Sequence, residues 1–134
     1  MGQPAARQGD QIVATDTHVV LVPAGPSPPV PTPLPHPFAG FIDGGLSADV
    51  NIEGRAAALV GSTADNTTPH VPTPPGVSFQ KPPSNKATVA LGSTTVFING
   101  KMAARQGDAA LTCNDPADLP AGTVVVSGGT VLIG

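Results

Sequence analysis

Three histidines and one cysteine are the residues of this chain whose types suit metal binding: His18, His36, His70 and Cys113. Zinc is commonly held in a tetrahedral site by histidine nitrogens and cysteine thiolates, and a site with four protein ligands is structural. The four residues therefore predict a closed zinc site of one cysteine and three histidines. Each residue alone also has an ordinary interpretation, because a single histidine is usually a surface or hydrogen-bonded residue and a buried cysteine packs as a small apolar side chain.

A short repeated segment gives three of these residues related positions. The segment occurs as Ala-Ala-Arg-Gln-Gly-Asp at 5–10 and 103–108, and in a diverged form, Ala-Ala-Leu-Val-Gly-Ser, at 57–62. His18 and His70 each lie eight residues after their copy, and Cys113 lies five residues after its copy. Three similar units thus each place one nitrogen or sulfur ligand a short loop downstream. His36 does not follow a copy of the segment in this way. It is included because a four-coordinate site needs a fourth ligand.

The elements that must position these residues are short strands. β-Branched runs bounded by Gly, Asn or Pro occur at 19–22, 48–54, 94–100, 122–128 and 130–134. Within them, Ile-Glu-Gly and Ile-Asn-Gly indicate tight turns, since glycine supplies the positive φ that such turns require. The alanine clusters of the repeats are too short to form stable helices. The pattern predicts an all-β fold built from hairpins and turns in three similar units.

Two proline-rich tracts interrupt this pattern, at 22–38 with eight prolines and at 69–83 with six. Proline favours extended polyproline II conformation and is excluded from central strands. We expect both tracts to be ordered loops of a single domain that spans residues 1–134. Because His36 and His70 lie inside them, metal binding would hold the tracts in place. The alternative for the tracts is a linker, or a ligand of an SH3-like domain.

The composition predicts a small domain that needs a cross-link to be stable. Of 134 residues, 3% are aromatic, and Gly (16) and Pro (17) together make up about a quarter. Charged residues are only 11%, which is low for a disordered chain. The single cysteine excludes a disulfide within the chain, so a metal is the available cross-link.

The charge pattern and the N-terminus bear on partners and location. The net charge is −3 and the six basic residues are scattered, so no basic stripe is available for nucleic acid. The N-terminal residues contain no apolar signal-peptide core, and no run approaches the roughly 20 apolar residues of a membrane helix. We expect synthesis in the bacterial cytoplasm without a Sec signal.

The repeated segments resemble those of a known family. Pro4-Ala5-Ala6-Arg7 followed by Gly9-Asp10, the phrase Val-Phe-Ile-Asn-Gly-Lys-Met-Ala-Ala-Arg-Gln-Gly-Asp at 96–108, and the terminal strands at 122–134 resemble the PAAR-repeat proteins. These proteins are sharp tips on the central spike of type VI secretion systems and related contractile injection machines. The resemblance implies a small cone of short strands with pseudo-threefold symmetry and zinc near its point. The implied zinc ligands are His18, His36, His70 and Cys113.

The resemblance also implies a mechanical function. One copy would cap the blunt end of a trimeric β-helical spike of the VgrG type and sharpen it for puncturing a target cell envelope. Three similar units in one chain can match the threefold axis of a homotrimer, and strand edges can continue the strands of the spike. The tip would be assembled on the apparatus, expelled with it, and contact the target membrane only transiently; effector cargo is an optional passenger. The middle copy departs from the pattern at Leu59 and Ser62, and since no effector segment follows Gly134 we expect a bare tip.

Two other functions remain as alternatives. If His36 is not a ligand, two histidines and a cysteine would leave an open position for water, as in zinc hydrolases. However, the chain has no general base at an informative spacing and no recognisable Ser/His/Asp pattern, so we expect no enzymatic activity. The other alternative is a free-standing zinc-binding domain, such as a metal carrier or sensor.

Overall fold

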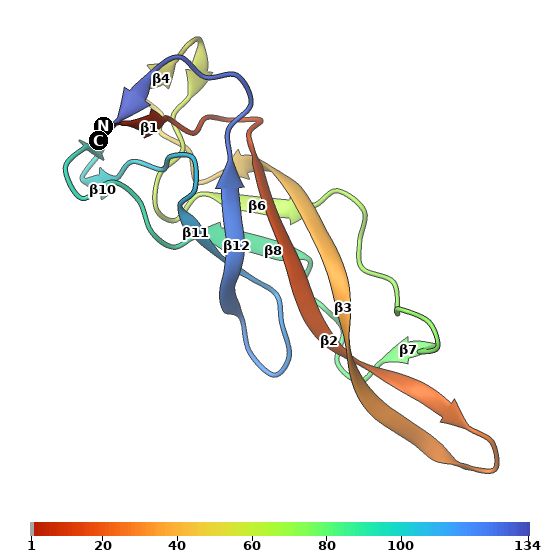
Figure 1. Ribbon diagram of the computed structural model, residues 1–134. Coiled ribbons are helices and arrows are strands. Elements are labelled where there is room, and N and C mark those ends of the chain that lie inside the picture. Colours follow the sequence, from red (N-terminus) through yellow and green to blue (C-terminus); the bar gives the residue numbers. More distant parts are fainter. Residues whose placement is uncertain (1) are drawn as a thin grey trace.

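The computed structural model describes residues 2–134 and shows strands, turns and irregular segments, with no helix in this range (Figure 1). The strands are β1 (Gln3–Pro4), β2 (Gln11–Ala24), β3 (Ser27–Gly44), β4 (Asn51–Ile52), β5 (Arg55–Ala56), β6 (Thr63–Asn66), β7 (Ser78–Phe79), β8 (Lys86–Val89), β9 (Phe97–Ile98), β10 (Lys101–Met102), β11 (Ala109–Thr112), β12 (Leu119–Val125) and β13 (Leu132–Ile133). The predicted all-β class is confirmed. Within residues 2–134, nothing resembles a helix that could span a membrane.

The body of the protein is a closed ring of antiparallel strands. Its order is β12-β11-β8-β6-β3-β2, and β12 pairs with β2 to close it, while β7 adds to the outer edge of β2. Closure leaves most of these strands without a free edge. The main core lies inside, where large side chains such as Ile12, Ile42 and Val124 are fully buried among small alanines.

Three two-stranded ladders lie at the end of the molecule that holds both termini (Figure 1). The pairs β4–β5 and β9–β10 are hairpins, and β1–β13 joins the two ends of the chain. The hairpin turns have positive φ at both central residues, Glu53 (53°) with Gly54 (81°) and Asn99 (52°) with Gly100 (78°). These are the tight turns that the sequence predicts.

Three loops at this end hydrogen-bond to one another in a closed cycle, which we call the base ring (residues 4–8, 56–60 and 102–106). Backbone N–H groups donate to carbonyls from Ala6 to Ala104 (2.9 Å), from Ala104 to Ala58 (3.0 Å) and from Ala58 to Ala6 (3.0 Å). A second set runs in the reverse sense, from Gln8 to Ala56 (2.8 Å), Val60 to Met102 (2.9 Å) and Gln106 to Pro4 (2.8 Å). The three central alanine side chains are at most 1% exposed. These methyl groups are therefore enclosed by the bonded loops.

A tight turn follows each loop of the base ring and starts a strand of the body. In the first and third copies, the carboxylates of Asp10 and Asp108 accept from the N–H of Arg7 and Arg105, both at 2.8 Å, and also pair with the guanidinium groups. In the middle copy the hydroxyl of Ser62 accepts from the N–H of the residue three before it, over 2.9 Å. In both copies, arginine and aspartate thus pair within the turn. Strands β2, β6 and β11 begin directly after these turns.

The prediction that residues 22–38 form a loop is wrong. Most of this tract belongs to the long hairpin of β2 and β3, whose ladder runs from Gln11 opposite Phe41 to Ala24 opposite Ser27. Four of the six prolines of β3 fall at alternate positions, 31, 33, 35 and 37, all opposite odd-numbered residues of β2. Their nitrogens therefore face away from β2, along an edge that β6 leaves free because it pairs only from Gly40 onward. The second tract, 69–83, is irregular except for β7.

Candidate metal centre

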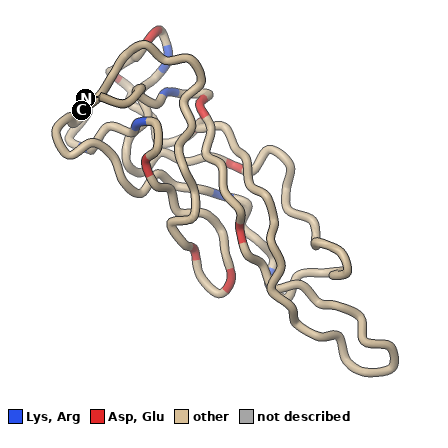
Figure 2. The backbone as a smooth tube through the Cα atoms, viewed as in Figure 1, with Lys and Arg blue, Asp and Glu red and all other residues tan. Residues whose placement is uncertain are grey.

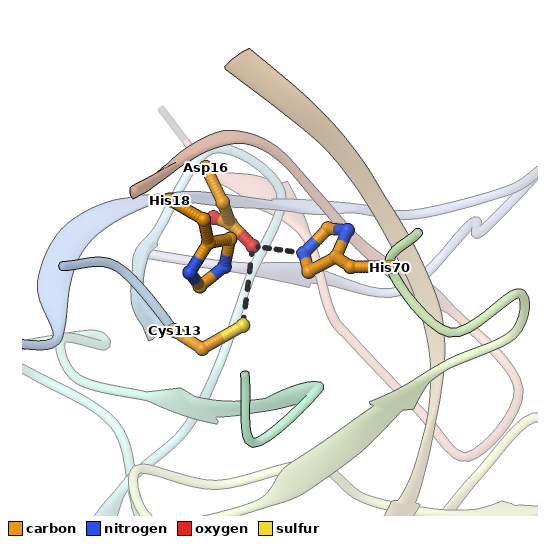
Figure 3. Close-up of side chains that lie close together, drawn as sticks. All are labelled: Asp16, His18, His70 and Cys113. Atoms are coloured by element: carbon orange, nitrogen blue, oxygen red, sulfur yellow. Dashed lines mark hydrogen bonds and ion pairs between the residues drawn. The ribbon is translucent and has the colours of Figure 1, made fainter. Parts of the chain in front are cut away.

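Four buried residues bring potential metal ligands together: Asp16, His18, His70 and Cys113. One ligand atom from each lies within 4.8 Å of all the others (Figure 3). Asp16 and His18 are two residues apart on the inward face of β2, His70 lies four residues after β6, and Cys113 directly follows β11. The three strands that follow the repeated turns thus converge here. This group could hold a metal ion.

His18 is the residue whose surroundings fit a metal best. Both of its ring nitrogens are buried and have no hydrogen-bond partner within the described residues. The nearest charged group is the Asp115 carboxylate, whose Oδ2 lies 3.5 Å from His18 Nδ1. Burial lowers the pKa of His18, which favours the neutral ring with a free lone pair. An unpaired buried polar group is costly, and a bound metal would remove that cost.

Asp16 is fully buried and contacts two other members of the group, as Figure 3 shows. Its Oδ2 accepts from His70 Nε2 over 2.9 Å and from the Cys113 thiol over 3.4 Å. Asn66 contacts the other ring nitrogen of His70 at 3.3 Å. Burial raises the pKa of the Cys113 thiol to about 11, so without a metal this sulfur keeps its proton. A metal would displace that proton and bind the thiolate.

His36 lies beside this group and is not part of it. It is opposite Asp16 in the β2–β3 ladder, and its ring centroid lies 5.4 Å from that of His18 and 5.5 Å from that of His70. Both of its nitrogens are occupied: Nδ1–H donates to the Leu34 carbonyl (2.9 Å), and Nε2 accepts from the Thr73 N–H (3.1 Å). To bind a metal through Nε2, His36 would have to give up the bond from Thr73. The structure therefore brings three of the four predicted ligands together, adds Asp16, and leaves His36 adjacent.

The residues after Cys113 hold its segment against β2. Asn114 Oδ1 accepts from the N–H of Thr17 (2.6 Å), and Asp115 Oδ2 accepts from the N–H of Val19 (2.9 Å). These bonds cap two amide groups on the edge of β2 that no strand covers. Sequence reasoning missed this role, and it missed Asp16 as well. The available signal for Asp16 was its position two residues before His18, since residues i and i+2 of a strand share one face.

Comparison of the chain with protein-family models finds no match, and comparison with curated protein sequences also finds none. The interpretation of the site therefore rests on its own geometry and on the repeated segments.

Proposed function

We propose that this protein is a structural spike tip of the PAAR-repeat kind, which caps a trimeric β-helical spike of a contractile injection machine and sharpens it for puncturing a cell envelope. The observation that carries the proposal is the base ring. Its three loops exchange equivalent backbone hydrogen bonds in a closed cycle, an arrangement that we interpret as pseudo-threefold symmetry. A single chain with such a base can place one similar surface against each subunit of a homotrimer.

The ladders around the base ring support this interpretation because their residues correspond. Ile52, Ile98 and Ile133 occupy equivalent ladder positions. They form a second, smaller core with one alanine from each loop: Ala5, Ala57 and Ala103. Next to them, Phe97 and Leu132 are about 60% exposed (58% and 61%). We propose that this face lies on the blunt end of the spike. The exposed apolar side chains would be buried there, and the short strands would continue the strands of the spike.

The proposed metal is zinc, which would tie together the three strands that leave the base ring. Three of the ligands would be His18, His70 and Cys113. The fourth would be either Asp16, which lies within the same group of ligand atoms, or His36, which the family resemblance implies. Both sets have four protein ligands and define a structural site. Zinc binding contributes roughly 10–16 kcal/mol in small zinc-dependent peptides, and here it would add to the folding free energy.

The capping proposal is tested by binding to the trimeric spike protein encoded alongside this chain, using size-exclusion chromatography. The wild-type chain is expected to co-elute with the trimer, and Phe97→Asp at the base is expected to lose binding because it places a charge in the apolar contact. Val30→Asp is the matched control, since Val30 is similarly exposed (52%) but lies in the β2–β3 hairpin, away from the base. Equal loss in both variants, or no binding by wild type, would contradict the proposal. Metal binding without trimer binding would instead support a free-standing zinc domain.

A further inference from the structure

The outer part of the β2–β3 hairpin carries no charged side chain, and the charged residues nearest to its root are Asp115, which accepts from the Val19 N–H, and Lys81, which follows Gln80. The segments 17–42 and 66–80 contain no Asp, Glu, Lys or Arg, so all 15 charged residues of the chain lie elsewhere. The two segments meet where β7 pairs with β2, at Val20 opposite Phe79 and Leu21 opposite Ser78. Figure 2 shows the outer part of the β2–β3 hairpin, residues 19–33, projecting away from the termini without a charged position. We call these residues the distal arm.

The free edges of the distal arm also lack amide donors. On β3, the outward-facing positions 31 and 33 of the arm, and 35 and 37 next to it, are all proline. On the outer edge of β2, the N–H of Val19 is bound by Asp115, Leu21 is covered by β7, and the next outward position is Pro23. An exposed strand edge normally presents unpaired N–H groups, and each of these is costly to bring into an apolar medium. Proline removes the donor part of that cost at alternate residues of this edge, and the outward carbonyls that remain can be hydrated at a headgroup boundary.

The exposed apolar side chains at this end are aliphatic. Val30 on the arm is 52% exposed, and Val71 and Val77 in the neighbouring tract are 72% and 67% exposed. The arm has no aromatic residue and no arginine, which are the residues enriched at protein–protein hot spots. Its proline-lined edge also cannot donate the N–H groups that pairing with a strand of another protein requires. These features fit a partner without hydrogen-bonding or charge specificity.

We propose that the distal arm is a lipid-contacting element that enters the boundary between headgroups and acyl chains of a bilayer. Absence of charge avoids the desolvation cost, and absence of edge donors avoids unpaired N–H groups. Past the β7 pairing at Leu21 the arm extends by about four residues, or roughly 13 Å at about 3.3 Å per residue. That reach exceeds the roughly 5–10 Å to which interfacial elements are buried. The inference deepens the proposed function, because it names the part that meets the envelope, but its test needs no spike protein.

The test uses the full chain, which has no tryptophan of its own. Val30→Trp places a fluorophore on the arm, and Phe97→Trp places one at a similarly exposed position (58%) of the base. Each variant is mixed with vesicles of neutral phosphatidylcholine, and then with vesicles that also contain anionic phosphatidylglycerol. We expect a blue shift and quenching by brominated lipid for Val30→Trp only, equal in both vesicles and insensitive to salt. No shift for Val30→Trp, or equal shifts for both variants, would overturn the proposal; so would a response confined to anionic vesicles.

A second variant controls for the affinity of tryptophan itself for lipid interfaces. In the Val30→Trp background, Val22→Asp places a charge opposite position 30 in the ladder, and we expect roughly tenfold weaker partition into vesicles. Phe97→Asp in the same background is the matched control and should leave partition unchanged. Circular dichroism and metal content establish that both variants fold. Unchanged partition in the Val22→Asp variant would show that the tryptophan alone contacts lipid and would overturn the proposal. Failure of spike capping would leave these outcomes unaffected.

Discussion

The base ring and the candidate metal centre bring the same three strands together in two places, by different means. At the base ring, backbone groups of three loops bond to one another around small alanines, and the same pattern occurs three times. At the candidate metal centre, the contacts are made by side chains that differ from strand to strand. The ring of His18 lies against the rings of His36 and His70, with centroids 5.4 and 4.9 Å away. Backbone bonding tolerates diverged side chains, whereas the metal centre depends on the identity of each residue.

This difference predicts that loss of the metal loosens one end of the protein only. Cys113→Ala should abolish metal binding and destabilise the protein more than any single substitution at the base ring, because three buried polar side chains lose their common partner. In native-state hydrogen exchange, amides of β2 near His18 and of the segment around Cys113 should lose protection, while those of the base ring keep it. Exchange that rises equally at both ends would show that the two regions are not separable. Metal content and melting temperature equal to wild type would show that the site is assigned wrongly.

The middle copy of the repeat gives a sharper test at the base. The hydroxyl of Ser62 accepts from the Leu59 N–H and donates to the Gly45 carbonyl, each at 2.9 Å. Ser62→Asp restores the consensus of the repeat, but a carboxylate cannot donate to Gly45 and has no arginine beside it. We expect a loss of about 2–4 kcal/mol in the free energy of unfolding, measured by denaturant titration.

The reverse change is the matched control. Asp108→Ser should cost less, since a serine hydroxyl can still accept from the Arg105 N–H, as Ser62 does in the middle copy. A stabilising effect of Ser62→Asp would mean that the three copies are interchangeable at the level of side chains, contrary to the contacts of Ser62.

The close approach of the loops in the base ring is tested by adding volume. Ala58→Val should cost about 1–3 kcal/mol because the side chain is 1% exposed and the neighbouring backbones are bonded to one another. Ala56→Val, at a less buried position of the same loop, is the control and should cost less. Equal stability of the two variants in thermal unfolding would indicate that the ring is loosely packed.

The smallest expected effect concerns a contact that only one copy makes. Glu53 Oε1 accepts from the Thr130 N–H (3.1 Å) and from Arg7 Nη1 (2.9 Å), and hydrogen bonds from Thr130 lower the pKa of Glu53. Since the pKa is lower in the folded state, the stabilisation is present above the ordinary value near 4.5 and is lost as the pH falls through the folded value. Glu53→Gln should therefore lower the melting temperature slightly at neutral pH and not at a pH below the folded pKa. A difference that persists in acid would mean that charge is not the cause.

The sequence predicts the base better than it predicts the metal end. The repeated Ala-Ala segments and the Glu53-Gly54 and Asn99-Gly100 turns are local signals, and each determines a local backbone geometry. The position of His18, His70 and Cys113 after the three copies also led to three members of the metal group. Asp16 was not found because its contacts with His70 and Cys113 are 54 and 97 residues distant in sequence. Residues 22–38 were predicted as a loop because their proline content alone does not reveal that four of the prolines, 31, 33, 35 and 37, alternate along the free edge of β3.

The most direct test of the central claim is native mass spectrometry of this chain mixed with the proposed partner, the trimeric spike protein encoded alongside it. We predict one chain per spike trimer with one bound zinc ion, because a single chain carries all three loops of the base ring and all residues of the candidate metal centre. Three chains per trimer, or a capped trimer without metal, would contradict the claim.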